Sequence, residues 1–287
     1  MDVFLQLIVN GIIAGGIYAL LAVSFSFIYS TTKFFNLAHG SIGVVAAYTV
    51  YFLTKQHGVS IWISVPSGIV VAAIVGWLIY RIVYSPLRKR RASSMVLLVS
   101  SLGVMIILQS LMAIIFSSNF RTITNQSVAR GFEAYGLHFS LLHVIILFTG
   151  CFVTCLLFVL YQRTLFGKAV NAVSDDEEVS KIVGINTNRI LSRVFLIGSG
   201  IGGLGGILFA LDTGIQPTSD LDLLLKGVIA AIVGGVGNIY GAVIGAFVLG
   251  IVENVGIWII PAQWKDAIAF GILIVFLLVR PGGILRK

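Results

Sequence analysis

Long apolar runs are the feature of this 287-residue sequence that most limits how it can fold. A helix needs about 20 mostly apolar residues to cross the hydrocarbon core of a bilayer. Hydrophobic residues make up 58% of the chain and charged residues only 10%, whereas a soluble domain carries roughly 25% charged residues. The composition therefore excludes a water-soluble enzyme and predicts an all-α, polytopic integral membrane protein with a single domain, 1–287. The clear candidate spans are 4–30, 59–84, 95–116, 140–161, 190–211 and 262–280.

Two further apolar segments are interrupted by polar residues or glycine. Residues 34–54 are shorter than the other spans and open with the sequence FFNLAHGS. Residues 222–257 are too long for one straight span and contain GGVGN at 234–238. The second segment therefore predicts two short spans that meet at a glycine break, with one broken span as the alternative. The expected total is eight or nine membrane segments.

Glycine spacing and a weak internal repeat indicate how these helices pack. Residues 11–20 (GIIAGGIYAL) resemble residues 198–207 (GSGIGGLGGI). The two segments are expected to run in opposite directions, as in inverted-repeat transporters. Glycines four residues apart, such as Gly198, Gly202 and Gly206, predict close helix packing. A dinucleotide site is excluded there because no strand precedes the glycines.

The positions of the basic residues indicate orientation. If residues 81–91 lie in the cytoplasm, 14 of the 19 Lys and Arg residues fall inside, and the five outside are Lys55, Arg121, Arg130, Lys226 and Lys265. Cytoplasmic loops of membrane proteins carry such an excess of positive charge. The N-terminus is therefore expected outside and the C-terminus in the cytoplasm. The net charge of +8 is explained by topology, and no nucleic-acid partner is expected.

Two polar segments are long enough to lie outside the membrane: an external loop at about 117–139 and a cytoplasmic loop at about 162–189. Ser174 stands three residues before Glu177, as in a capping box, and Gly184 is expected to end the helix. A helix of about 8–10 residues is therefore expected on the cytoplasmic face. It is either a solvated linker or a docking helix whose apolar residues enter a partner's groove. The residues assigned to this helix are Asp175, Asp176, Glu177, Glu178, Val179, Ser180, Lys181, Ile182, Val183 and Gly184.

Polar groups at membrane depth are costly and usually face a cavity or a partner. Asn36 and His39 are three residues apart and are expected on one helix face, where they either satisfy backbone carbonyls at a helix break or line a path. Glu253 and Asn254 are either a satisfied interfacial pair or part of the path. The candidates for a translocation path are Asn36, His39, Gly40, Gly235, Gly237, Asn238, Glu253 and Asn254.

Signs of catalysis are missing from the sequence. It contains no G-x-x-x-x-G-K-[ST] phosphate loop, no metal-ligand spacing and no recognisable Ser, His and acid set. We therefore expect no catalytic residues, no metal and no cofactor.

Several motifs, in order along nearly the whole chain, resemble the branched-chain amino acid permeases of ABC importers. They are YALLA at 18–22, FNLAHG at 35–40, EVSKIVGI at 178–185, GGVGNIYGA at 234–242 and RPGGI at 280–284. Lys226-Gly227, a short distance before the motif at 234–242, is part of the same resemblance. Glu178 and Gly184 match the E-A-A-x-x-x-G coupling motif of importer permeases, whereas Val179 and Ser180 replace its two alanines.

The resemblance implies a multi-pass permease of a bacterial or archaeal inner membrane. Its implied partners are a homologous second permease subunit, two cytoplasmic ATP-binding subunits that dock on 175–184, and an external (periplasmic) substrate-binding protein. The implied cargo is a branched-chain or related neutral amino acid, with urea, short amides or simple sugars as alternatives. An ATP-independent secondary transporter would need a buried acid, and only Glu253 approaches membrane depth. Asp212, Asp220 and Asp222 are expected in an external loop.

Overall fold

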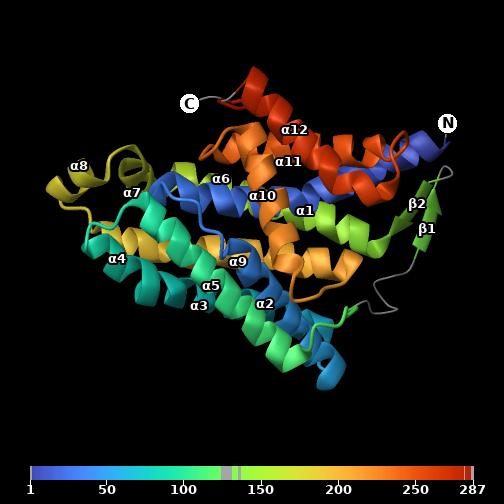
Figure 1. The fold of residues 1–287 in the computed structure, drawn as a ribbon, viewed down its shortest axis with the longest axis horizontal. Helices are drawn as coiled ribbons and strands as arrows, with labels where there is room; N and C mark the ends of the chain where they lie inside the picture. Colours follow the sequence, from blue (N-terminus) through green and yellow to red (C-terminus); the bar gives the residue numbers. More distant parts are fainter. Residues whose placement is uncertain (1, 124–130, 135–136, 281, 286–287) are drawn as a thin grey trace.

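Seven helices long and apolar enough to cross a membrane make up most of the computed structural model, which describes residues 2–123, 131–134, 137–280 and 282–285. They lie side by side in an elongated bundle (Figure 1). Five are single helices: α1 (Asp2–Thr32), α5 (Ser94–Phe116), α6 (Leu141–Arg163), α9 (Thr187–Thr213) and α11 (Ile239–Gly256). The sixth runs through α3 (Ile61–Ile79), η2 (Tyr80–Tyr84) and α4 (Ser85–Lys89), and the seventh through η3 (Ala262–Trp264) and α12 (Lys265–Val279). Apart from one short two-stranded hairpin, the described fold is helical and polytopic, as predicted.

Two shorter helices account for the interrupted segments. The first is α2 (His39–Tyr51), which continues as a π-helical turn, η1 (Phe52–Gln56). The second is α10 (Ser219–Gly234), which runs across the bundle at a steep angle to α1 (Figure 1). Residues 235–238 separate α10 from α11, which confirms the glycine break between two helices, although α11 and not α10 is among the seven helices long and apolar enough to cross a membrane. Gly235 and Gly237 have φ of +116° and +81°, conformations that glycine adopts without steric cost.

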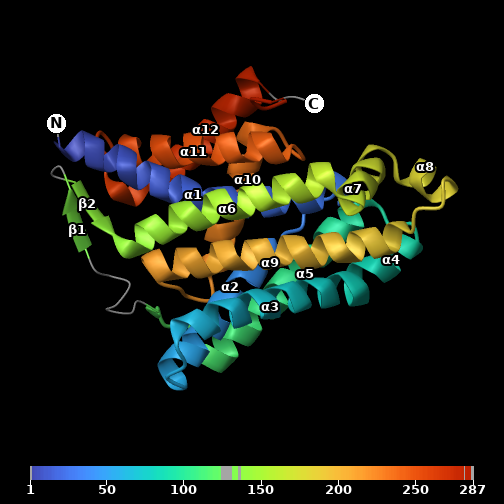
Figure 2. The same ribbon diagram turned by 180° about the vertical axis from the view of Figure 1, so that it is seen from behind.

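The bundle has two distinct ends (Figures 1 and 2). The N-terminal end carries the start of α1 and a hairpin of β1 (Gly131–Ala134) and β2 (Leu137–Ser140). Only a polar loop was expected there, without a hairpin. The opposite end, called the α8 end below, carries α4, α7 (Leu165–Asp175) and α8 (Glu177–Ile182). The described parts of the two predicted polar segments therefore lie at opposite ends of the molecule.

The centre of the bundle is formed by α1 and α9, which run in opposite directions and pack together. A methyl group on Gly198 would meet the Ile28 side chain at 2.7 Å, and one on Gly202 would meet the His39 ring at 2.7 Å. Gly206 lies directly against the backbone of Gly43 in α2. This glycine face confirms the predicted close packing, because larger residues would separate the helices.

Candidate functional site

The polar segment at 162–189 forms two helices, α7 and α8, where one was predicted. Asp176 is the N-cap of α8, and its Oδ1 accepts hydrogen bonds from the amides of Glu178 (2.8 Å) and Val179 (3.0 Å). The predicted cap, Ser174, is wrong: it lies in the last turn of α7, and its hydroxyl donates to the carbonyl of Ser30 at 2.9 Å. Because the helix begins after Asp176, it has six residues rather than 8–10. Gly184, with φ of +87°, follows its end as predicted.

The outer face of α8 exposes apolar side chains. Val179, Ile182 and Val183 are 54%, 83% and 68% exposed. Ser180 on the inner face is buried, and Glu178 and Lys181 are exposed beside the apolar residues. An exposed apolar patch on a charged helix is typical of a protein contact surface.

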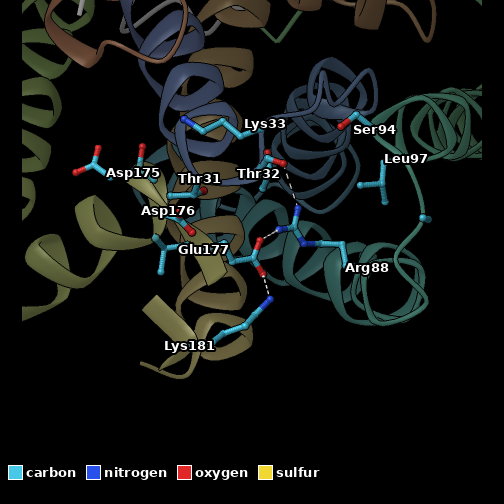
Figure 3. Close-up of a pocket in the computed structure, with 13 residues that line it drawn as sticks. Thr31, Thr32, Lys33, Arg88, Ser94, Leu97, Asp175, Asp176, Glu177 and Lys181 are labelled. Carbon is cyan, nitrogen blue, oxygen red and sulfur yellow. Dashed lines mark hydrogen bonds and ion pairs between the residues drawn. The ribbon is translucent and has the colours of Figure 1, made fainter. Parts of the chain in front are cut away.

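The inner face of α8 is held by Arg88, which comes from α4 (Figure 3). One guanidinium nitrogen of Arg88 donates to Glu177, and another donates to the main-chain carbonyl of Thr32 at 3.1 Å. Lys181 also contacts Glu177 at 2.8 Å. Burial opposes ionisation of Glu177, but the hydrogen bond from Lys181 and the charge of Arg88 outweigh it and hold the pKa of this carboxyl below its ordinary value. The contact is therefore a charged one at neutral pH.

A polar pocket of about 450 Å³ lies beside this contact (Figure 3). Its walls come from the end of α1, the start of α5 and the α7–α8 turn.

A second link at this end involves Asn188 in the first turn of α9. Its Oδ1 accepts hydrogen bonds from the hydroxyls of Tyr80 (2.8 Å) and Ser85 (2.9 Å). Helices α1, α4, α8 and α9 are thus joined at one end of the bundle.

Asn36 and His39 are buried at the entry to α2. The prediction that they share a helix face is wrong, because His39 is the first residue of α2 and Asn36 lies in the turn before it. Asn36 Oδ1 accepts from the Tyr84 hydroxyl at 2.8 Å, and His39 Nε2 lies 2.8 Å from the Ser24 hydroxyl. Their partners in these bonds are side chains rather than freed backbone carbonyls.

Gly40 is enclosed between two helices. It packs directly against the carbonyl of Asp220, while the Asp220 carboxylate accepts from Ser41 at 2.8 Å. Asp220 was expected in an external loop, but it lies in the first turn of α10 and is 1% exposed. The two short helices therefore meet here.

Gly235, Gly237 and Asn238 form the break between α10 and α11. Asn238 caps α11 by accepting from the amides of Tyr240 (3.0 Å) and Gly241 (3.2 Å). Its Nδ2 donates to the carbonyl of Leu285 at 3.1 Å. The break thus holds the C-terminal segment against the bundle.

Glu253 is fully buried and forms the centre of a charged cluster. Its carboxylate accepts from Lys226 Nζ (2.5 Å) and from the Tyr18 hydroxyl (2.8 Å). Lys226 also contacts Asp266, whose side chain is 68% exposed, at 2.8 Å. Lys226 was counted among the basic residues on the external side of the membrane, and it is buried in α10. The Asn254 Nδ2 donates a hydrogen bond to the Gly250 carbonyl, and its Oδ1 accepts one from Lys265 Nζ at 3.3 Å.

The structure brings the predicted residues of α8 together, whereas the path candidates fall in three separate places. They lie at the start of α2, at the α10–α11 break and around Glu253; their role in a path stays a prediction.

Sequence reasoning missed Arg88, Lys226 and Asp220. A lone lysine and a lone glutamate in neighbouring apolar runs were a usable signal for the buried pair. Nothing distinguished Arg88 from the basic residues beside it. Within the described part of the chain, no group of three or more His, Cys, Asp or Glu residues could hold a metal ion.

Comparison with known proteins gives matches over nearly the whole chain. Residues 7–277 match the family described as "Branched-chain amino acid transport system / permease component". The high-affinity branched-chain amino acid transport system permease protein LivH of Escherichia coli (strain K12) is 29% identical, covering 99% of this chain and 96% of that protein. The probable branched-chain amino acid transport permease protein LivH of Methanocaldococcus jannaschii is 31% identical, covering 97% and 92%. The autoinducer 2 import system permease protein LsrC of Salmonella paratyphi B is 30% identical over 43% of this chain and 38% of that protein.

Proposed function

Because the chain belongs to the branched-chain amino acid transport system permease family, we propose that it is the membrane permease subunit of an ATP-driven importer. ATP is hydrolysed on separate subunits that bind α8, and a second, homologous permease subunit completes the path. An external binding protein delivers the cargo. The cargo is a branched-chain or related neutral amino acid, as the names of the LivH relatives suggest. The partial match to LsrC keeps sugar-like cargo as the alternative.

The observation that carries the proposal is the two-sided character of α8. Its outer face exposes Val179, Ile182 and Val183, while its inner face is fixed to the bundle through Glu177 and Arg88. A helix that served only as a linker would have no need of both features. A helix that transmits motion needs both, because it must contact its driver on one side and the moving helices on the other.

The α8 end lies in the cytoplasm in this proposal, and the excess of basic residues expected on that side supports it. Lys33, Arg88 and Lys181 all lie around the same pocket at this end. The N-terminal end then faces the outside, where the binding protein would dock. ATP-driven closure of the ATPase pair would move α8 and the helices joined to it, which supports alternating access.

The test of this proposal is replacement of Ile182 by Asp. The charge would oppose burial of this side chain in an ATPase groove, so we expect loss of co-purification with the ATPase subunits. Leucine-stimulated ATP hydrolysis in proteoliposomes with loaded binding protein should fall with it. Ile259, which is 88% exposed near the opposite end, provides the matched control Ile259→Asp, which should retain the ATPase subunits. Normal association and normal stimulation in Ile182→Asp would refute the docking role of α8.

A further inference from the structure

Arg88 is the side chain that joins three elements at the α8 end. It belongs to α4, and its guanidinium contacts both Glu177 at the start of α8 and the carbonyl of Thr32 at the end of α1 (Figure 3). The last carbonyls of a helix have no partner within the helix, and a cation there also interacts favourably with the helix dipole. Arg88 therefore satisfies the end of α1 and holds α8 with the same planar group.

The neighbouring basic residues are placed differently. Lys89, Arg90 and Arg91 are exposed, whereas the Arg88 side chain is only 16% exposed. The two adjacent glutamates differ in the same way. The Glu177 side chain is 28% exposed and faces Arg88, whereas Glu178 is exposed. The contact is thus specific to one member of each charged run.

Helix α8 depends on such contacts for its orientation. With six residues it is too short to be stable by itself, so its side chains must fix its position. The Arg88–Glu177 contact links α8 itself to α4, whereas the bond from Ser174 to Ser30 reaches α8 only through α7.

We propose that Arg88 is the positioning residue through which movement of α8 reaches α1 and α4, with Glu177 as its partner on α8. This inference rests on the proposed function, since it assumes that an ATPase subunit moves α8. Without the Arg88–Glu177 contact, α8 can still bind the ATPase subunit, but it turns independently of the membrane helices. ATP hydrolysis then continues with less transport.

The experiment uses the complete complex of permease, ATPase and binding protein in proteoliposomes, with radiolabelled leucine as the probe. In Arg88→Gln we expect normal co-purification of the ATPase subunits and a fall of about fivefold or more in leucine taken up per ATP hydrolysed. Arg90→Gln removes the same charge from an exposed neighbour and should leave this ratio unchanged. Hydrogen exchange of 177–183 should rise in Arg88→Gln and not in Arg90→Gln, which separates a freed α8 from a misfolded protein.

A double-mutant cycle tests whether the two residues act through each other. Glu177→Gln should reproduce the defect, and Arg88→Gln/Glu177→Gln should be no worse than either single variant. An unchanged ratio in Arg88→Gln, or additive defects in the double variant, would overturn the proposal. Loss of the ATPase subunits from Arg88→Gln would also overturn it, because the contact would then serve docking. Failure of the unmodified complex to hydrolyse ATP in response to the loaded binding protein would instead reject the proposed function.

Discussion

Lys226 and Glu253 are two opposite charges buried against each other between α10 and α11. Removing two charges from water costs several kcal/mol for each ion, and their mutual attraction and hydrogen bonds offset this cost only when both are present. Both carboxylate oxygens of Glu253 have a partner, from Lys226 and Tyr18. Either charged residue is therefore compatible with a membrane fold only when the other is present as its counter-charge.

This pairing predicts an asymmetric response to mutation. Lys226→Met leaves Glu253 buried without its counter-charge and should lower the free energy of unfolding by about 3–5 kcal/mol. Lys226→Met/Glu253→Gln removes both charges and should be closer to the unmodified protein than the single variant is. Asp266→Asn loses only an exposed contact, at a cost of about 0–1 kcal/mol. Thermal unfolding of the purified protein in detergent measures all three, and a double variant less stable than Lys226→Met would contradict this account.

Among the helices, α9 shows how a glycine-rich face determines packing. Gly202 and Gly206 face α2 and its entry, where His39 and Gly43 come close. The period of four residues keeps these glycines on one side of the helix. In contrast, a Cβ at Gly103 in α5 would have no atom within 4 Å apart from its own stretch of helix. The same residue type is thus required in one helix and replaceable in another.

Alanine substitutions distinguish the two helices. In Gly206→Ala the new methyl group would press on the Gly43 backbone, so α9 and α2 must separate, at a cost of about 1–3 kcal/mol. Gly103→Ala meets no neighbour and raises helix propensity, so it should be neutral or stabilising by about 0.5–1 kcal/mol. Thermal unfolding in the same detergent gives both values. Equal effects of the two changes would show that α9 and α2 do not pack as described.

For the whole molecule, the distribution of basic residues predicts orientation. Arg90 and Asn119 are both exposed, Arg90 beside α4 and Asn119 just after α5, so one membrane span separates them. With Cys151 and Cys155 replaced by Ala, Asn119→Cys should react with a membrane-impermeant maleimide on intact cells. Arg90→Cys should react only after the cells are permeabilised. The reverse pattern would put the N-terminal end in the cytoplasm and reject the orientation.

Much of the site could be anticipated from local patterns, and some of it could not. Gly184 ends α8 as predicted because a positive φ at a helix end is a local preference of glycine. Ser174 failed as the cap because Asp176, two residues later, offers a stronger acceptor and Ser174 bonds Ser30 instead. The partner Ser30 is 144 residues away, and local sequence says nothing about contacts at that separation.

The sequence by itself determined that the chain is an all-α membrane protein, that its second half contains a glycine break, and which permease family it resembles. These properties follow from run length, glycine spacing and motif order, which are local along the chain. Only the tertiary structure decided that Arg88 binds Glu177 and that Lys226 and Asp220 are buried. A charge in the sequence shows only that it needs water or a partner. The packing of distant helices decides which of these it has.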